Sequence, residues 1–117
     1  MNDAPPEVAR LLALIGDAAT LRFVEAHGGT RVHIRLGHTS RNALADLLGA
    51  AAAAALAQAF GGDYIRVPLA KKWRARQYRA QGLSYSAIAR RLGCSDVTVW
   101  EYLNGNRGSA QMALPLG

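Results

Sequence analysis

The stretch that decides the fold covers residues 83–100 and reads LSYSAIARRLGCSDVTVW. Ser84 and Ser95 each stand just before an apolar-patterned run, where a helix N-cap is expected. Ala89, Gly93 and Val99 follow at intervals of four and six residues. They supply a small residue at a helix contact, a turn residue that tolerates positive φ, and an apolar anchor in the second helix. The spacing predicts a helix-turn-helix over residues 85–104.

A basic helix is expected to precede this pair, from about Lys72 to Gln81, with Ala75 and Tyr78 on its inner face and Gly82 at its end. Residues 71–105 are therefore predicted to form a domain of three helices. In its last two helices, Arg90 and Arg91 should face outward. The predicted core of these two helices comprises Ile88, Ala89, Leu92, Val99, Tyr102 and Leu103.

The charge of the chain is concentrated in and beside this domain. The 117 residues carry a formal net charge of +6. Between Arg66 and Arg91 there are eight Lys and Arg and no Asp or Glu, whereas residues 1–65 carry five Arg and six acidic residues. Such a segment favours a polyanionic partner, either nucleic acid or an anionic membrane surface. The predicted phosphate contacts are Lys71, Lys72, Arg74, Arg76, Arg90 and Arg91.

The helix over residues 95–104 is expected to lie in the DNA major groove and to reach base edges. Asp96 or Glu101 would accept a hydrogen bond from a cytosine amino group, and Thr98 or Trp100 would contact a thymine methyl group. Two alternatives stay open. Trp100 equally fits a partly buried core aromatic, and Asp96 equally fits a charge that stabilises the helix N-terminus. The predicted base contacts are Ser95, Asp96, Thr98, Trp100, Glu101 and Asn104.

The segment over residues 1–70 shows a degenerate internal repeat. One constant shift along the chain places Leu11 on Leu44, Gly16 on Gly49 and the pair Gly28-Gly29 on Gly61-Gly62. Each copy, at about 8–37 and 41–70, reads as an apolar helix, a glycine, a second helix, a Gly-Gly break and a short strand. The strands are predicted at 31–35 and 64–67. The fold expected for the chain is mainly α, with helical repeat units that end in a small β-ribbon, followed by the three-helix domain.

Residues 1–70 are interpreted as a dimerisation or assembly region. The first copy would bury one face of a helix, through Leu11, Leu14, Ala18, Leu21 and Val24. Residues 49–60 are almost entirely alanine and need cover from the other repeat or from a second subunit. The two strands pair either within one chain or with a symmetry mate. The predicted dimerisation residues are Val32, Ile34, Ile65 and Val67. Residues 106–117 lack periodicity and are predicted to be a flexible tail.

Several other classes of protein are disfavoured. A single cysteine, Cys94, excludes an intrachain disulfide and a multi-cysteine zinc site. His27, His33 and His38 do not converge in a metal-binding pattern, and neither a nucleophile elbow nor a phosphate-binding glycine loop is present. We expect a non-enzyme without cofactor, metal or small-molecule substrate. Without a signal peptide or a membrane span, it is expected in the bacterial cytoplasm, associated with the nucleoid.

The resemblance extends beyond a general motif. Residues 59–68, AFGGDYIRVP, follow a helical region and precede a basic helix and the helix-turn-helix. Over about residues 44–104 this order resembles the middle operon regulator (Mor) family of Mu-like phages. The resemblance implies a transcription activator that binds double-stranded DNA as a homodimer and recruits host RNA polymerase. No membrane partner is expected, because the apolar run over residues 49–60 is too short to span a bilayer. Asp63 departs from the amide or hydroxyl residue often found after Gly-Gly in that family.

Two functions remain open from the sequence. The first is a phage- or prophage-type transcription regulator, either activator or repressor. The second is a packaging or nucleoid-associated factor that uses its helix-turn-helix for protein contacts or for nonspecific DNA contacts. We expect a homodimer, because one helix-turn-helix alone gives weak binding.

Overall fold

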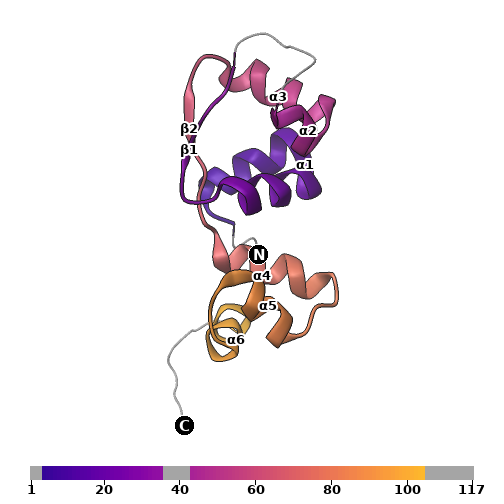
Figure 1. The fold of residues 1–117 in the computed structure, drawn as a ribbon, viewed down its shortest axis with the longest axis vertical. Coiled ribbons are helices and arrows are strands. Elements are labelled where there is room, and N and C mark those ends of the chain that lie inside the picture. The colour runs from indigo at the N-terminus through magenta and orange to yellow at the C-terminus, as the bar shows by residue number, and fades with distance from the viewer. Residues whose placement is uncertain (1–3, 36–42, 105–117) are drawn as a thin grey trace. The chain divides into compact units, whose positions relative to one another are not determined.

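The computed structural model describes residues 4–35 and 43–104 (Figure 1). The chain divides into two compact units, and the boundary in the sequence falls between Ala70 and Lys71. The expected mainly helical fold with a small antiparallel ribbon is confirmed, and the predicted tail at 106–117 lies outside the described residues. The elements in chain order are α1 (Pro6–His27), β1 (Arg31–His33), α2 (Ala43–Leu48), α3 (Ala50–Phe60), β2 (Tyr64–Arg66), α4 (Lys71–Ala80), α5 (Tyr85–Leu92) and α6 (Asp96–Asn104).

Two glycines interrupt the helices of the N-terminal unit. Gly16 has φ of +84° inside α1, and Gly49 has φ of +96° between α2 and α3. A side chain at either position would meet no atom within 4 Å, so glycine is needed for its backbone conformation and not for space. The predicted sequence of helix, glycine and second helix is confirmed in both halves of the unit.

The predicted inner face of α1 was partly wrong. Leu11 and Val24 are buried as expected, but Leu14 and Leu21 are only half-buried and Ala18 is exposed. The kink at Gly16 changes the helical phase, so one 3.6-residue pattern cannot run through both halves of the helix. Beyond the kink, the buried residues are Ala19, Thr20, Phe23 and Val24.

The two strands pair with each other inside one chain. They run antiparallel, with Val32 opposite Ile65, and both strands are shorter than predicted. Backbone hydrogen bonds continue the pairing beyond the strands. The bonds and their lengths are Gly29 N to Val67 O at 2.7 Å, Gly62 N to Ile34 O at 2.7 Å, Val67 N to Thr30 O at 2.8 Å and Ile34 N to Asp63 O at 2.9 Å. These bonds form two matched pairs under the shift that relates the two sequence repeats, so the two halves of the ribbon have the same local structure.

The residues that follow the two strands belong to the buried core. Ile34 and Val67 are 1% and 0% exposed. Helix α1 packs against both α2 and α3 (Figure 1). In α3 only Ala53 and Leu56 are buried, so much of the alanine-rich helix faces outward. The largest buried aliphatic and aromatic residues of the unit are Val8, Leu11, Phe23, Val24, Ile34, Leu44, Leu48, Leu56 and Val67.

Gly28 is expected to be intolerant of any side chain. A Cβ there would lie 2.7 Å from the Val24 carbonyl oxygen and 3.1 Å from the Pro68 carbonyl oxygen. Because both neighbours are backbone atoms, Gly28→Ala should destabilise the N-terminal unit by about 1–3 kcal/mol, as overpacking does elsewhere. Urea denaturation followed by circular dichroism measures this loss. Ala26→Ser, at an exposed position on the same helix, is the matched control, and an unchanged midpoint for Gly28→Ala would contradict the close approach seen here.

Candidate nucleic-acid interface

Helices α4, α5 and α6 pack against one another around a shared core. The predicted core residues Ile88, Ala89, Leu92 and Val99 are buried, and Tyr102 and Leu103 are half-buried. In α4, Ala75 and Tyr78 are buried as predicted. Sequence reasoning missed Trp73, which is only 4% exposed. Its aromatic character was the available signal, but four of its near neighbours in α4 are cations.

The start of α5 and the turn between α5 and α6 have the predicted chemistry. Ser84 Oγ accepts a hydrogen bond from Ala87 N at 3.1 Å, and Ser95 Oγ accepts one from Thr98 N at 3.1 Å. Both serines therefore cap their helices, as expected from the sequence. Gly93 ends α5 in the left-handed conformation, with φ of +71°. Ser84 thus fixes where α5 begins, and Gly93 and Ser95 fix where α5 ends and α6 begins.

The outer face of α6 carries acidic, apolar and amide side chains. Trp100 is 55% exposed, so the alternative that it is a core aromatic is wrong. Val97 is 64% exposed, and sequence reasoning did not include it in the candidate site. Thr98 is half-buried, and its hydroxyl lies 3.1 Å from Ser95 Oγ, so it belongs to the cap. The exposed residues from the cap to the end of α6 are Ser95, Asp96, Val97, Trp100, Glu101 and Asn104.

The start of α5 lies beside this outer face of α6. Tyr85 lines one shallow hollow together with Asp96, Val97, Trp100 and Glu101. Asn104 Nδ2 donates to Trp100 O at 2.9 Å and contacts Tyr85 Oη at 3.5 Å. The first turn of α5 and most of the outer face of α6 therefore form one surface.

Between residues 71 and 104, the cations of this unit all lie on α4 and α5. Arg90 and Arg91 are exposed as predicted, whereas Lys71, Lys72, Arg74 and Arg76 are half-buried. Arg91 and Arg74 also contact Tyr78: the Arg91 guanidinium lies 5.2 Å from its ring centroid, and Arg74 Nε lies 3.4 Å from its hydroxyl.

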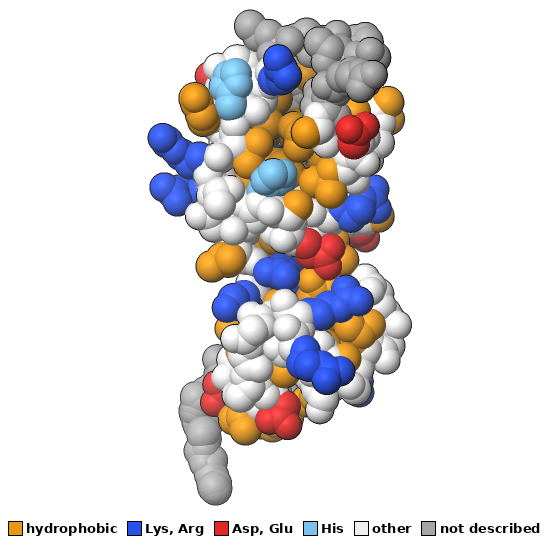
Figure 2. Space-filling view, viewed as in Figure 1, with side chains coloured by type: hydrophobic (Ala, Val, Ile, Leu, Met, Phe, Trp, Pro, Cys, Tyr) orange, Lys and Arg blue, Asp and Glu red, His pale blue; other side chains and the backbone are white. Residues whose placement is uncertain are grey.

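Arg79 is a further exposed cation, placed 5.0 Å from the centroid of the Tyr85 ring, and it was not among the predicted phosphate contacts. In Figure 2 the basic side chains of this unit and its acidic side chains lie on different parts of the visible face. The two acidic residues of the described part of this unit, Asp96 and Glu101, both belong to α6. In the described part of this unit, the positive charges therefore lie on α4 and α5 and the negative charges on α6.

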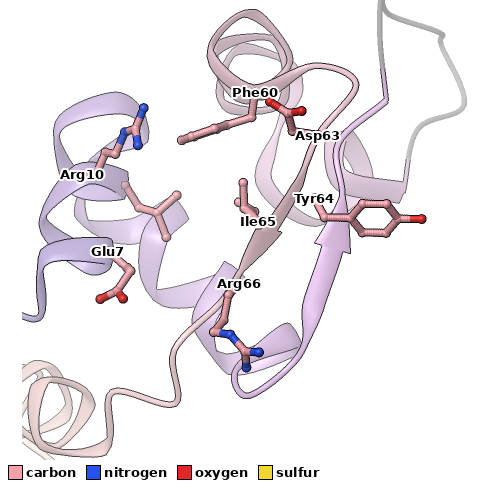
Figure 3. Close-up of a pocket in the computed structure, with 8 residues that line it drawn as sticks. Glu7, Arg10, Phe60, Asp63, Tyr64, Ile65 and Arg66 are labelled. Carbon is pink, nitrogen blue, oxygen red and sulfur yellow. The ribbon is translucent and has the colours of Figure 1, made fainter.

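The N-terminal unit holds a pocket of about 360 Å³ between α1, the end of α3 and β2 (Figure 3). Arg10 lies over the ring of Phe60, 4.7 Å from its centroid, and the ring of Tyr64 points away from the pocket. Glu7, Asp63 and Arg66, which also line it, are exposed. A preformed ligand site is largely enclosed. All four charged residues that line this pocket are exposed, so it lacks that enclosure.

Two further properties concern the whole described part of the chain. Within residues 4–35 and 43–104, no three His, Cys, Asp or Glu side chains are close enough to hold a metal ion. Among the helices that the structure describes, none is long and apolar enough to cross a membrane.

A family model described as a homeodomain-like domain matches residues 67–112, a range that contains α4, α5 and α6. The C-terminal unit is a helix-turn-helix domain. Domains of this type place their last helix in the major groove of DNA, so the match indicates DNA binding. No curated protein and no solved structure matches the chain. The family match supports the general class of domain and does not extend to the middle operon regulator family.

Proposed function

We propose that this chain is a sequence-specific transcription regulator that reads DNA with α6. The observation that carries the proposal is the capped α6 helix of the helix-turn-helix domain, which presents a continuous exposed face while its inner residue Val99 is fully buried. A recognition helix needs that arrangement, because its side chains must reach base edges while the domain holds its axis fixed.

Within this proposal the two sets of contacts have different tasks. Ser95, Asp96, Trp100, Glu101 and Asn104 face the bases, and Thr98 supports the start of the helix through its bond to Ser95. The cations on α4 and α5 bind phosphates and supply affinity without sequence information. The proposed phosphate contacts remain Lys71, Lys72, Arg74, Arg76, Arg90 and Arg91.

The N-terminal unit serves as the assembly platform of the regulator. The two matched pairs of ribbon hydrogen bonds support a duplicated helix-GlyGly-strand unit over residues 8–37 and 41–70. In this structure Ile34 and Val67 are buried inside one chain, and Val32 pairs with Ile65. A role for these four residues between subunits therefore stays a prediction. The resemblance to middle operon regulators supports a prophage-type activator that acts as a homodimer and contacts host RNA polymerase.

Selection of binding sites from random duplex DNA tests this proposal. A regulator enriches one motif. A homodimer enriches two inverted half-sites separated by about 10–10.5 base pairs or a multiple of that spacing. The mass of the protein in solution shows independently whether two chains associate. Recovery of no motif would contradict the proposal.

One observation favours a second function, in which the domain handles DNA without regard to sequence or contacts another protein. The outer face of α6 is acidic and apolar, whereas the cations lie on α4 and α5. If the cations alone met DNA, binding would be nonspecific and α6 would remain free for a protein partner. Equal affinity for all duplex sequences, with a full salt dependence, would identify this function.

A further inference from the structure

The chemistry of the α6 face limits which bases it can read. From Asp96 to Asn104 the helix contains no Lys or Arg. The amide nitrogen of Asn104 donates to Trp100 O at 2.9 Å, and Ser95 Oγ caps the helix through Thr98 N at 3.1 Å. The exposed groups left over are the carboxylates of Asp96 and Glu101, the aliphatic side chain of Val97 and the indole of Trp100, which has an apolar ring and one N–H donor. The face therefore consists mainly of hydrogen-bond acceptors and apolar surface, and it carries no cationic donor.

Each base pair offers a different pattern in the major groove. Guanine presents two acceptors, O6 and N7, and is usually read by the donors of Arg or Lys. Cytosine presents the N4 amino donor, and thymine presents a C5 methyl group beside an acceptor. A carboxylate is repelled by the acceptors of guanine and is satisfied by the cytosine amino group. An exposed aliphatic or aromatic side chain gains most from the thymine methyl.

We propose that α6 recognises a pyrimidine-rich strand. Asp96 and Glu101 accept from cytosine N4 amino groups, and Val97 and Trp100 pack on thymine methyl groups. This inference rests on the proposed function, since it assigns the bases that the same face reads. It adds Val97 to the predicted base contacts, and it leaves α6 without the Arg or Lys that usually reads guanine O6 and N7.

The spacing on the helix strengthens the assignment. Asp96 and Trp100 are four residues apart, as are Val97 and Glu101, so each carboxylate has an apolar neighbour on the same side of the helix. Neighbours at this spacing have Cβ atoms about 5–6 Å apart. Successive bases on one strand rise about 3.4 Å, so each pair can address bases one or two positions apart. Mixed runs of cytosine and thymine satisfy both pairs.

The carboxylates make the protein selective between bases, but they do not raise its overall affinity for DNA. They add negative charge next to the phosphates, and the cations of α4 and α5 must offset that repulsion. A carboxylate that loses water without gaining an amino donor is costly. A wrong base therefore lowers the affinity more than a right base raises it. Tyr85, which lines the same hollow, helps to keep water from these contacts.

The test uses the full-length protein and a duplex obtained by site selection. Replacing each thymine of the read strand with deoxyuridine removes only the C5 methyl group. We expect about a fourfold loss of affinity per contacted methyl, which matches the burial of one methyl-sized group. Replacing guanines with 7-deazaguanine removes the N7 acceptor, and we expect no loss. A loss with 7-deazaguanine and none with deoxyuridine would overturn the proposal.

Two variants test which side chains cause these changes in affinity. In Trp100→Ala the loss caused by deoxyuridine should shrink, because the side chain that packs on the methyl is gone. In Glu101→Gln the preference at one position should move from cytosine to adenine, since a glutamine amide both donates to N7 and accepts from N6. The expected change in the ratio of affinities is about tenfold. Both residues are exposed, so the fold should be retained, and circular dichroism checks this.

Glu25→Gln on the exposed surface of α1 is the matched control for the loss of one acidic charge. If Glu101→Gln, like Glu25→Gln, has the base preference of the wild-type protein, α6 does not read cytosine. In that case the inference fails, but the proposed function stands. If the wild-type protein enriches no site at all, the proposed function fails, and this inference fails with it.

Discussion

Replacing Ile88 with alanine is expected to unfold the C-terminal unit and abolish specific DNA binding. Ile88 is 0% exposed at the centre of α5, in a unit whose described helices span only residues 71–104. Truncation of a buried isoleucine to alanine costs about 2–5 kcal/mol, and a domain this small has little stability to spare. The loss therefore approaches or exceeds the whole free energy of unfolding of the unit.

Tryptophan fluorescence isolates this effect, because both tryptophans of the chain, Trp73 and Trp100, lie in the C-terminal unit. Urea denaturation followed at the tryptophans should shift strongly for Ile88→Ala. Ser86→Ala, at an exposed position of the same helix, should leave the midpoint nearly unchanged. A small shift for Ile88→Ala would mean that α5 does not hold the unit together as the structure describes.

Removing Arg90 and Arg91 together is expected to weaken binding to every DNA sequence alike. Both side chains are exposed on α5 and carry no information about bases. Each phosphate contact contributes about 0.9 to the slope of log affinity against log salt. The double alanine variant should lower that slope by about 1.8 and weaken binding at physiological salt roughly 10- to 100-fold. Unchanged affinity would remove α5 from the DNA interface.

Two controls make this measurement specific. Arg22→Ala and Arg31→Ala remove exposed cations from the N-terminal unit and should leave the salt slope unchanged. Because the Arg91 guanidinium lies 5.2 Å from the centroid of the buried Tyr78 ring, Arg91→Ala also removes packing. The melting temperature of the double variant therefore has to be measured beside its affinity, and binding compared well below that temperature.

The C-terminal unit could be predicted from the sequence because its signals are local. The serine caps, the positive-φ glycine at position 93 and the buried Ile88 and Val99 all depend on neighbours a few residues away. The small ribbon was also predicted, but not its pairing within one chain. Whether the strands pair within one chain or between two depends on contacts between segments far apart in the sequence. The periodicity of the sequence gives no information about such contacts.

The errors have physical reasons as well. The inner face of α1 was assigned with one continuous period, and the kink at Gly16 breaks that period. Val97 was overlooked in the site because an apolar residue in a helix is usually a core residue, and only the packing of α6 shows that this one faces outward. The same packing exposes Trp100. The pattern had already predicted Ser95, Asp96, Trp100, Glu101 and Asn104 on the outer face of α6. The structure added Val97 and placed Thr98 in the cap.

We propose that this protein reads a specific DNA sequence with its helix-turn-helix domain. The most direct test is the ratio of its affinity for a selected duplex to its affinity for random duplex of equal length, measured over a salt titration. A specific regulator should prefer its site by at least ~10³ at physiological salt. The salt dependence should be carried largely by the phosphate contacts common to both duplexes. A ratio near one across the titration would contradict the claim.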